Sequence, residues 1–120
     1  MGLNLTKNSI IYVDTCIFIY TVESDPNYWS LIQPLWKNLQ DGNIKIITSE
    51  LTLMEVLVFP LKNNDNQLVE DYKTFLTSSN IELIPINQSI LLQGARLRGI
   101  TNLKTPDAIH LATALLEKCD

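Results

Sequence analysis

Residues 10–15 read Ile-Ile-Tyr-Val-Asp-Thr, a run in which four apolar or aromatic side chains lead directly to a carboxylate. β-Branched and aromatic residues in such a run predict a strand buried on both faces, over Ile10–Asp14. Asp14 then ends this strand. In open parallel α/β sheets the carboxyl ends of the strands meet loops and helix N-termini around a ligand, so Asp14 is a candidate site residue.

The composition indicates one globular domain. The 120 residues, of which 46% are hydrophobic, suffice for one core and are too few for two ordinary domains, so we expect a single domain over residues 1–120. The formal net charge of -4 argues against a broad basic face that holds nucleic acid by its phosphates alone. Any contact with nucleic acid must therefore be local or mediated by a metal.

The cysteines and the apolar runs bear on location. Cys16 lies in a segment expected to be a core helix, Cys119 lies near the C-terminus, and no signal peptide precedes them. This pattern fits the reducing cytosol, so we expect a cytoplasmic protein. No apolar run approaches the roughly 20 residues of a membrane-spanning helix, so we expect no membrane association.

Strand and helix signals alternate along the rest of the chain. Asp25-Pro26 is expected to start a helix that Gly42 ends, with a kink or break at Pro34. Pro60 and Gly99 are expected to end two further helices. The remaining expected elements are buried helical turns over 16–22, strands over 44–48 and 81–86, and helices over 49–60, 64–76, 89–98 and 105–119.

A second acid, Glu55, lies in the second turn of the helix that Ser49 is expected to cap. Beside it, Leu51, Met54 and Val58 form an apolar stripe that we expect to face the core. An acid next to such a stripe is often a plain solvated residue. It belongs to a site only if the helix directs it toward Asp14.

A third acid, Asp107, opens the last predicted helix. Thr105 is expected to be the N-cap, Pro106 the first helical residue, and Asp107 lies in the first turn, where the helix dipole favours a negative charge. Asp107 therefore has a structural reason to be there, and a site role stays open. His110, the only histidine, is its neighbour on the helix surface. We expect a structural or supporting role for His110, with zinc ligand and general base as alternatives.

The basic residues near Asp107 have two possible interpretations, and so do the two tryptophans. Arg96, Arg98 and Lys104 precede Asp107 and form either an exposed basic patch or a set that positions phosphates beside an acidic site. Trp29 and Trp36 recur at helical spacing, which is typical of a core stripe; stacking on bases is the alternative.

Several chemistries have no motif in this chain. It has no glycine-rich phosphate loop, no Cys-x-x-Cys pair and no nucleophile elbow. A phosphatase with an aspartate nucleophile is a competitor, but that chemistry needs a second Asp at position 16, which here is Cys16. The remaining carboxylates offer hard oxygen ligands, which select Mg²⁺ or Mn²⁺. A divalent ion so bound activates water and neutralises charge on a phosphodiester.

Three stretches resemble motifs of the PIN-domain family, especially its VapC-like bacterial branch. They are Ile-Tyr-Val-Asp-Thr at 11–15, Thr-Ser-Glu-Leu-Thr-Leu-Met-Glu-Val-Leu at 48–57 and Thr-Pro-Asp-Ala-Ile-His-Leu-Ala-Thr-Ala at 105–114. The resemblance implies a three-layer α/β/α sandwich with a mainly parallel central sheet. It also implies a Mg²⁺- or Mn²⁺-dependent endoribonuclease in which Asp14, Glu55 and Asp107 bind the metal and Thr15 lends a hydroxyl.

The resemblance also implies partners, namely an RNA substrate, a small antitoxin protein and a second copy in a homodimer. Family members usually continue into another strand that carries a further acid, whereas this sequence stops at Asp120. We therefore expect three acids instead of four. Two further hypotheses remain: a PIN-like module that binds RNA or a partner with weak catalysis, and an unrelated α/β phosphatase.

Overall fold

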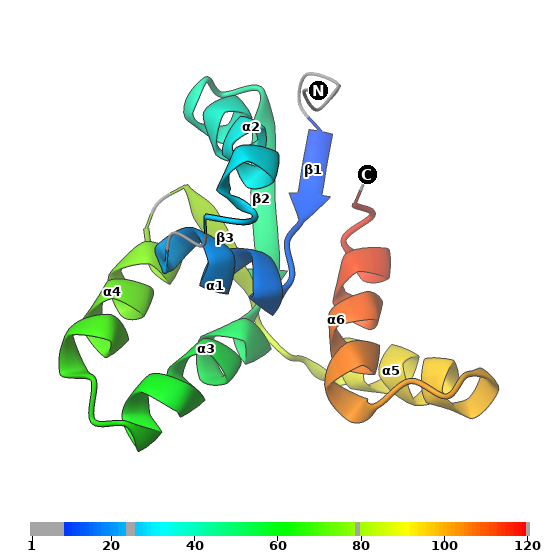
Figure 1. The fold of residues 1–120 in the computed structure, drawn as a ribbon. Helices are drawn as coiled ribbons and strands as arrows, with labels where there is room; N and C mark the ends of the chain where they lie inside the picture. The colour runs from blue at the N-terminus through cyan, green and yellow to red at the C-terminus, as the bar shows by residue number, and fades with distance from the viewer. Residues whose placement is uncertain (1–8, 24–25, 79, 120) are drawn as a thin grey trace.

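A computed structural model describes residues 9–23, 26–78 and 80–119, which form a parallel sheet surrounded by helices (Figure 1). The strands are β1 (Ser9–Tyr12), β2 (Ile44–Ser49) and β3 (Ile81–Ile84). The helices are α1 (Thr15–Val22), α2 (Trp29–Gln40), α3 (Glu50–Lys62), α4 (Asn66–Leu76), α5 (Gln88–Ile100) and α6 (Thr105–Leu116).

The sheet has the order β1-β2-β3, and both pairs of strands are parallel. Ile46 at the centre of β2 is opposite Ile11 on one side and Ile81 on the other. All three strands therefore end at the same edge of the sheet. Pro85 follows β3, an edge strand, which agrees with the end or edge position expected for a proline.

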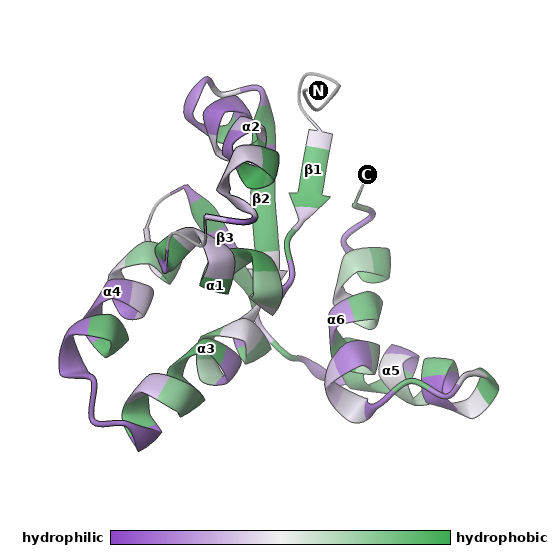
Figure 2. Cartoon of the chain, viewed as in Figure 1, coloured by the Kyte–Doolittle hydropathy of each residue, from purple (hydrophilic) through white to green (hydrophobic). Residues whose placement is uncertain are grey.

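The two faces of the sheet carry separate apolar cores, because successive side chains of a strand point to opposite faces. Ile11, Val13 and Ile46 pack with α1 to α4, whereas Tyr12 and Ile47 pack with α5 and α6. Figure 1 shows α1 to α4 on one side of the strands and α5 and α6 on the other, and Figure 2 shows β1 and β2 as largely hydrophobic. The predicted α/β sandwich with a parallel sheet is confirmed.

The first strand is shorter than expected, because Asp14 caps α1 instead of ending β1. The Asp14 carboxylate accepts a hydrogen bond from the backbone N–H of Ile17, with 3.4 Å between Oδ1 and N. Val13 still donates its N–H to the carbonyl of Ile47 at 3.0 Å, so the chain stays beside β2 until the helix begins. Cys16, expected in a core helix, is exposed on α1.

Several helix ends differ from the sequence prediction. α2 begins at Trp29 rather than at Pro26, which lies in a turn, and Asp25 lies outside the described residues. Pro34 lies inside α2 without ending it, and α3 continues past the buried Pro60 to Lys62. A proline removes one helical hydrogen bond, and packing of the neighbouring turns outweighs this local cost. Gly99 similarly lies inside α5 rather than at its end.

The buried faces also depart from expectation. Met54 is 60% exposed and Val58 43%, because α3 buries the face that contains Thr52, Val56 and Pro60. The two tryptophans expected in the core, Trp29 and Trp36, also differ in their burial. Trp36 packs against Phe18 and Phe75 and donates to Thr21, while Trp29 stays 40% exposed. Within the described residues, no helix is both long and apolar enough to cross a membrane.

Candidate functional site

Asp14 and Asp107 reach one open pocket from opposite ends of the described chain. The pocket has a volume of about 290 Å³ and is lined by Tyr12, Asp14, Asp107, His110, Leu111 and Ala114. Asp14 lies at the N-terminus of α1 and Asp107 in the first turn of α6, and both carboxylates are exposed. Each helix N-terminus stabilises the negative charge beside it.

Asp107 owes its place to the start of α6. Lys104, not the expected Thr105, is the N-cap residue of this helix, and Pro106 follows within the first turn. The Thr105 hydroxyl instead accepts a hydrogen bond from Nη1 of Arg98 at 2.9 Å. Helical spacing alone predicts one buried stripe over Ala108, Leu111, Ala112 and Leu115. Ala112 is buried against the sheet and Ala108 against Gly94 of α5, whereas Leu111 and Leu115 are exposed.

Glu55 approaches this region from α3 and is fixed through one oxygen. Its Oε1 accepts a hydrogen bond from Oγ1 of Thr15 at 2.7 Å and lies 2.6 Å from Nε2 of His110. Thr15 is the first residue of α1 and also lies 3.5 Å from the Thr52 hydroxyl. The α3 helix therefore directs Glu55 toward the start of α1, as a site role for this acid requires.

His110 connects Glu55 to Tyr12. Its Nδ1 is hydrogen-bonded to the Tyr12 hydroxyl, and the two rings meet edge to face with centroids 5.8 Å apart. The hydroxyl also accepts the backbone N–H of Ser49 at 3.2 Å. Burial, the largest effect, raises the pKa of Tyr12 to about 12, with added contributions from the charges of Glu55 and Asp14. Tyr12 is therefore a neutral hydroxyl at pH 7.

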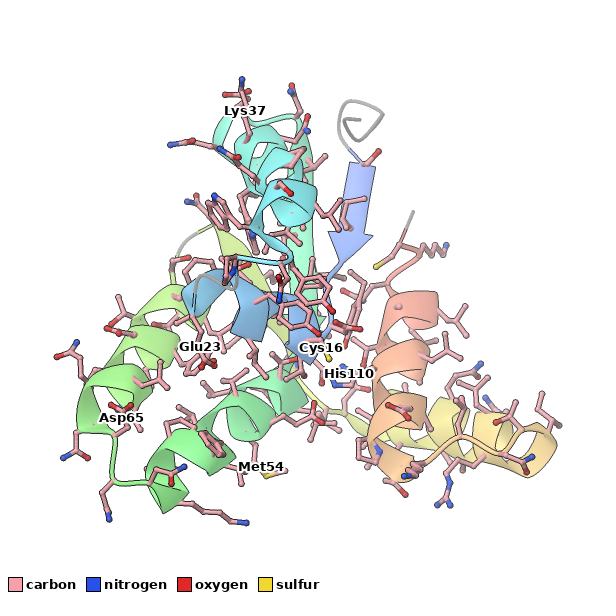
Figure 3. The ribbon with its side chains drawn as sticks, viewed as in Figure 1. Cys16, Glu23, Lys37, Met54, Asp65 and His110 are labelled. Atoms are coloured by element: carbon pink, nitrogen blue, oxygen red, sulfur yellow. The ribbon has the colours of Figure 1, made fainter. Side chains whose placement is uncertain are left out.

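The three carboxylates act on a common neighbour, Cys16. Burial raises the pKa of the Cys16 thiol, and the negative charges of Asp14, Glu55 and Asp107 raise it further. Figure 3 shows Cys16 and His110 in the region where α1, α3 and α6 converge. The three acids singled out in the sequence thus all act electrostatically on Cys16, while their role in a metal site stays a prediction.

Tyr12 was not identified as a site residue, although a signal for it exists. Tyr12 and Asp14 are two residues apart at the end of a strand, so the alternation of side chains predicts that both face the same side. The partnership between His110 and Glu55 has no comparable signal, since 55 residues separate them and only the packing of α3 near α6 brings them together.

The three basic candidates have different surroundings. Arg98 uses its guanidinium to hold the segment before α6, donating to the carbonyl of Leu103 at 3.0 Å as well as to Thr105. Arg96 is exposed and donates to Gln93 on its own helix at 3.1 Å. Lys104 is exposed at the start of α6. Arg98 and Lys104 thus flank the segment that leads to Asp107.

The donor set fits a hard divalent cation in its chemistry. Carboxylates and a hydroxyl are ligands suited to Mg²⁺ and Mn²⁺. In the arrangement described, however, no three acidic, histidine or cysteine side chains of residues 9–23, 26–78 and 80–119 form a group that could hold a metal ion. Asp14 and Asp107 line the pocket. Glu55 does not line it, but is hydrogen-bonded to His110, which does.

Comparisons with known proteins place the chain in a family. The model of the PIN domain matches residues 11–120. A solved toxin–antitoxin complex from Klebsiella pneumoniae is similar, with a TM-score of 0.63 and 29% identity over 94% of this chain and 82% of that chain. A crystal structure of VapBC2 from Rickettsia felis, bound to a DNA fragment from its promoter, has a TM-score of 0.69 and 20% identity over 92% and 83% of the two chains.

A search of functionally curated proteins found no match. The Rickettsia structure supports the fold alone, since its sequence identity is low. The match over residues 11–120 is decisive, because it includes all three acidic motifs and excludes the alternative of an unrelated phosphatase. The resemblance noted in the sequence is confirmed, and this chain belongs to the PIN-domain family.

Proposed function

We propose that this protein is a metal-dependent endoribonuclease that cleaves RNA phosphodiester bonds, and that it is the toxin of a toxin–antitoxin pair. The observation that carries the proposal is the pocket that Asp14 and Asp107 share. Glu55 is connected to this pocket by its hydrogen bond to His110, which also lines it. Membership of a family whose members are generally nucleases agrees with this arrangement.

In this proposal, Asp14, Glu55 and Asp107 would hold the divalent ion, either Mg²⁺ or Mn²⁺. The ion would activate water and stabilise negative charge on the phosphodiester. Thr15 supports Glu55 through its hydroxyl, because it donates to the same oxygen that His110 contacts. The thiol at position 16 stays protonated near neutral pH, since its pKa is raised, and adds no charge to the acids.

RNA must approach an acidic protein, so its contacts are expected to be local. The formal net charge of -4 disfavours a wide phosphate-binding face. We propose that Arg96, Arg98 and Lys104 attract the RNA backbone at the start of α6. Because Arg98 already holds the carbonyl of Leu103, Lys104 and Arg96 are the freer cations of the three.

We propose a small antitoxin and a second copy of this chain as protein partners, and the cytoplasm as the location. The similar Klebsiella structure is described as a toxin–antitoxin complex, which supports the antitoxin. Exposed apolar side chains on α3 give the chain apolar surface for association, namely Met54, Val58, Phe59 and Leu61. Light scattering of the purified protein tests the homodimer: a mass near 13.6 kDa would contradict it.

The test of the enzyme is cleavage of a mixed pool of structured and single-stranded RNA. Wild type and Asp14→Asn are each incubated with Mn²⁺, Mg²⁺ or EDTA. We expect cleavage only by wild type with a metal, and a loss of at least 10²-fold in Asp14→Asn, on the order of what removal of one transition-state-stabilising group costs. Asp41→Asn is the matched control, since Asp41 caps the distant end of α2.

The second candidate is a PIN-like module that binds RNA or a partner without efficient cleavage. The observation in its favour is that, in the described part of the chain, the acidic side chains form no group that could hold a metal. This candidate predicts that folded wild type retains RNA in a filter-binding assay while Mn²⁺ produces no cleavage. Metal-dependent cleavage that Asp14→Asn abolishes would reject it.

A further inference from the structure

His110 is the only described side chain that bridges the aromatic end of β1 and the acid of α3. Its Nδ1 contacts Tyr12 and its Nε2 lies 2.6 Å from Oε1 of Glu55. The imidazole is largely buried, with 12% of its side-chain surface exposed, compared with 28% for Glu55. Three elements distant in sequence, β1, α3 and α6, are thus joined through one ring.

The hydrogen bond to Glu55 indicates which nitrogen of His110 carries a proton. A carboxylate can only accept, so Nε2 donates to Glu55, and Nδ1 of a neutral ring then accepts from the Tyr12 hydroxyl, which also has Ser49 and Thr48 as partners. A neutral imidazole that accepts at Nδ1 carries its proton on Nε2 and donates it to Glu55. A charged imidazole also donates from Nε2, so the bond to Glu55 holds in either charge state.

Glu55 receives two hydrogen bonds, and both arrive at Oε1. Thr15 donates from one side at 2.7 Å and His110 from the other at 2.6 Å. No hydrogen bond of the described residues reaches Oε2, so the lone pairs of this oxygen are left for another ligand, although Glu55 itself does not line the pocket of Asp14 and Asp107. A long glutamate side chain fixed in this way loses less conformational freedom when a ligand binds.

We propose that His110 is a positioning residue, which fixes the Glu55 carboxylate for the divalent cation without binding that cation itself. The inference rests on the proposed function, and it assigns His110 to neither of the roles suggested by its chemistry alone, zinc ligand or general base. Hydrogen-bonding partners of metal ligands typically change metal affinity by about 10–100-fold. His110 therefore acts on the cation through Glu55.

Two substitutions separate the contacts of the ring. The amide of His110→Gln reaches about as far as Nε2, so it retains a donor for Glu55. The amide of His110→Asn reaches only about as far as Nδ1, so it keeps a partner for Tyr12 and loses the donor to Glu55. Leu115→Ala is the control, because Leu115 is exposed on the same helix.

The measurement is the Kd for Mn²⁺, from the free-ion signal in electron paramagnetic resonance, with circular dichroism to verify folding. We expect Kd to rise roughly 10–100-fold in His110→Asn and to stay near the wild-type value in His110→Gln and Leu115→Ala. RNA cleavage by His110→Asn should recover at high Mn²⁺ concentration, since mass action restores the loaded enzyme.

The outcomes distinguish this inference from the proposed function. Equal Kd values for wild type and His110→Asn, or equal weakening in His110→Asn and His110→Gln, overturn the positioning role and leave the nuclease proposal intact. A folded wild type that binds no Mn²⁺ overturns the nuclease proposal and the positioning role together. If His110→Asn does not fold, Tyr12→Phe replaces it, because this change leaves His110 in place without the hydroxyl that orients the ring.

Discussion

At the residue scale, the pKa of Cys16 depends on the charges of the candidate site. Its thiol is exposed, yet burial of its surroundings and three carboxylates raise its pKa. A raised pKa lowers the fraction of reactive thiolate at any given pH below it. The reactivity of the Cys16 thiol is therefore a probe of the charges of Asp14, Glu55 and Asp107, called here the acidic cluster, and it requires neither substrate nor metal.

We predict that Asp107→Asn shifts the pH profile of Cys16 alkylation to lower pH. Removal of one negative charge lowers the thiol pKa, so iodoacetamide should react faster at pH 8 than it does with wild type. The rates are measured in EDTA in a Cys119→Ser background. Asp41→Asn is expected to leave the profile unchanged, and identical profiles for Asp107→Asn and wild type would contradict a shared acidic cluster.

Single residues of the site were predictable to different degrees. Asp14 and Asp107 follow from local signals, since one ends an apolar strand run and the other opens a helix after a proline. Their common pocket agrees with the sequence interpretation, while their metal-binding role stays a prediction. The Tyr12–His110–Glu55 chain was missed because sequence patterns specify the face of an element and not its partner across the core.

At the scale of elements, α1 and α4 are joined by a buried tyrosine. Tyr72 on α4 is 1% exposed and donates its hydroxyl to Glu23, which follows α1 as its C-cap. Burial raises the pKa of Tyr72, and the hydrogen bond to Glu23 raises it further. The contact fixes the far end of the helix whose near end Asp14 caps.

We predict that Tyr72→Phe lowers the free energy of unfolding by about 1–2 kcal/mol, the typical loss for a hydrogen bond to a partly solvated charged group. Urea denaturation measures it. Glu23→Gln retains an acceptor and should lose less. Because the folded pKa of Tyr72 exceeds the unfolded value, its contribution is complete below pH 10 and falls as pH rises further. An alkaline decline equally steep in Tyr72→Phe would contradict this contribution.

The order of strands and helices was predictable, whereas several helix ends were not. Runs rich in isoleucine mark β1, β2 and β3, and polar caps such as Ser49 mark helix starts. Pro60 is buried inside α3, which continues to Lys62, whereas α5 passes Gly99 only as far as the exposed Ile100, a difference within the usual uncertainty of a helix end. Which apolar residues of α3 and α6 are buried depends on neighbouring helices, which the period of a single helix does not specify.

At the scale of the whole molecule, the proposed metal site would link stability to metal. Asp14, Glu55 and Asp107 all raise the pKa of Cys16, and the mutual repulsion of such like charges would destabilise the folded protein when no cation is bound. A cation that binds only the folded state reverses this effect by mass action. The expectation that residues 1–120 form one domain predicts a single cooperative transition in the same experiment.

We predict that Mn²⁺ raises the Tm of wild type, by a free-energy gain of about 2.7 kcal/mol at a concentration 100 times Kd. The double variant Asp14→Asn, Asp107→Asn should show no gain, because it lacks both acids that line the pocket. Differential scanning calorimetry with and without EDTA measures the shift. An equal shift in both proteins would assign the metal to other residues.

The order in which the elements of the candidate site occur along the chain has a consequence for synthesis on the ribosome. The candidate site takes Tyr12 and Asp14 from β1 and the turn after it, Glu55 from α3, and Asp107 with His110 from α6. A nascent chain that ends at residue 100 thus contains the first strand and most of the apolar core, but lacks the pocket-lining residues of α6, namely Asp107, His110, Leu111 and Ala114. If the protein is the proposed ribonuclease, its site is complete only after α6 has left the exit tunnel and docked, so the ribosome that makes the protein would not be exposed to its activity during most of translation.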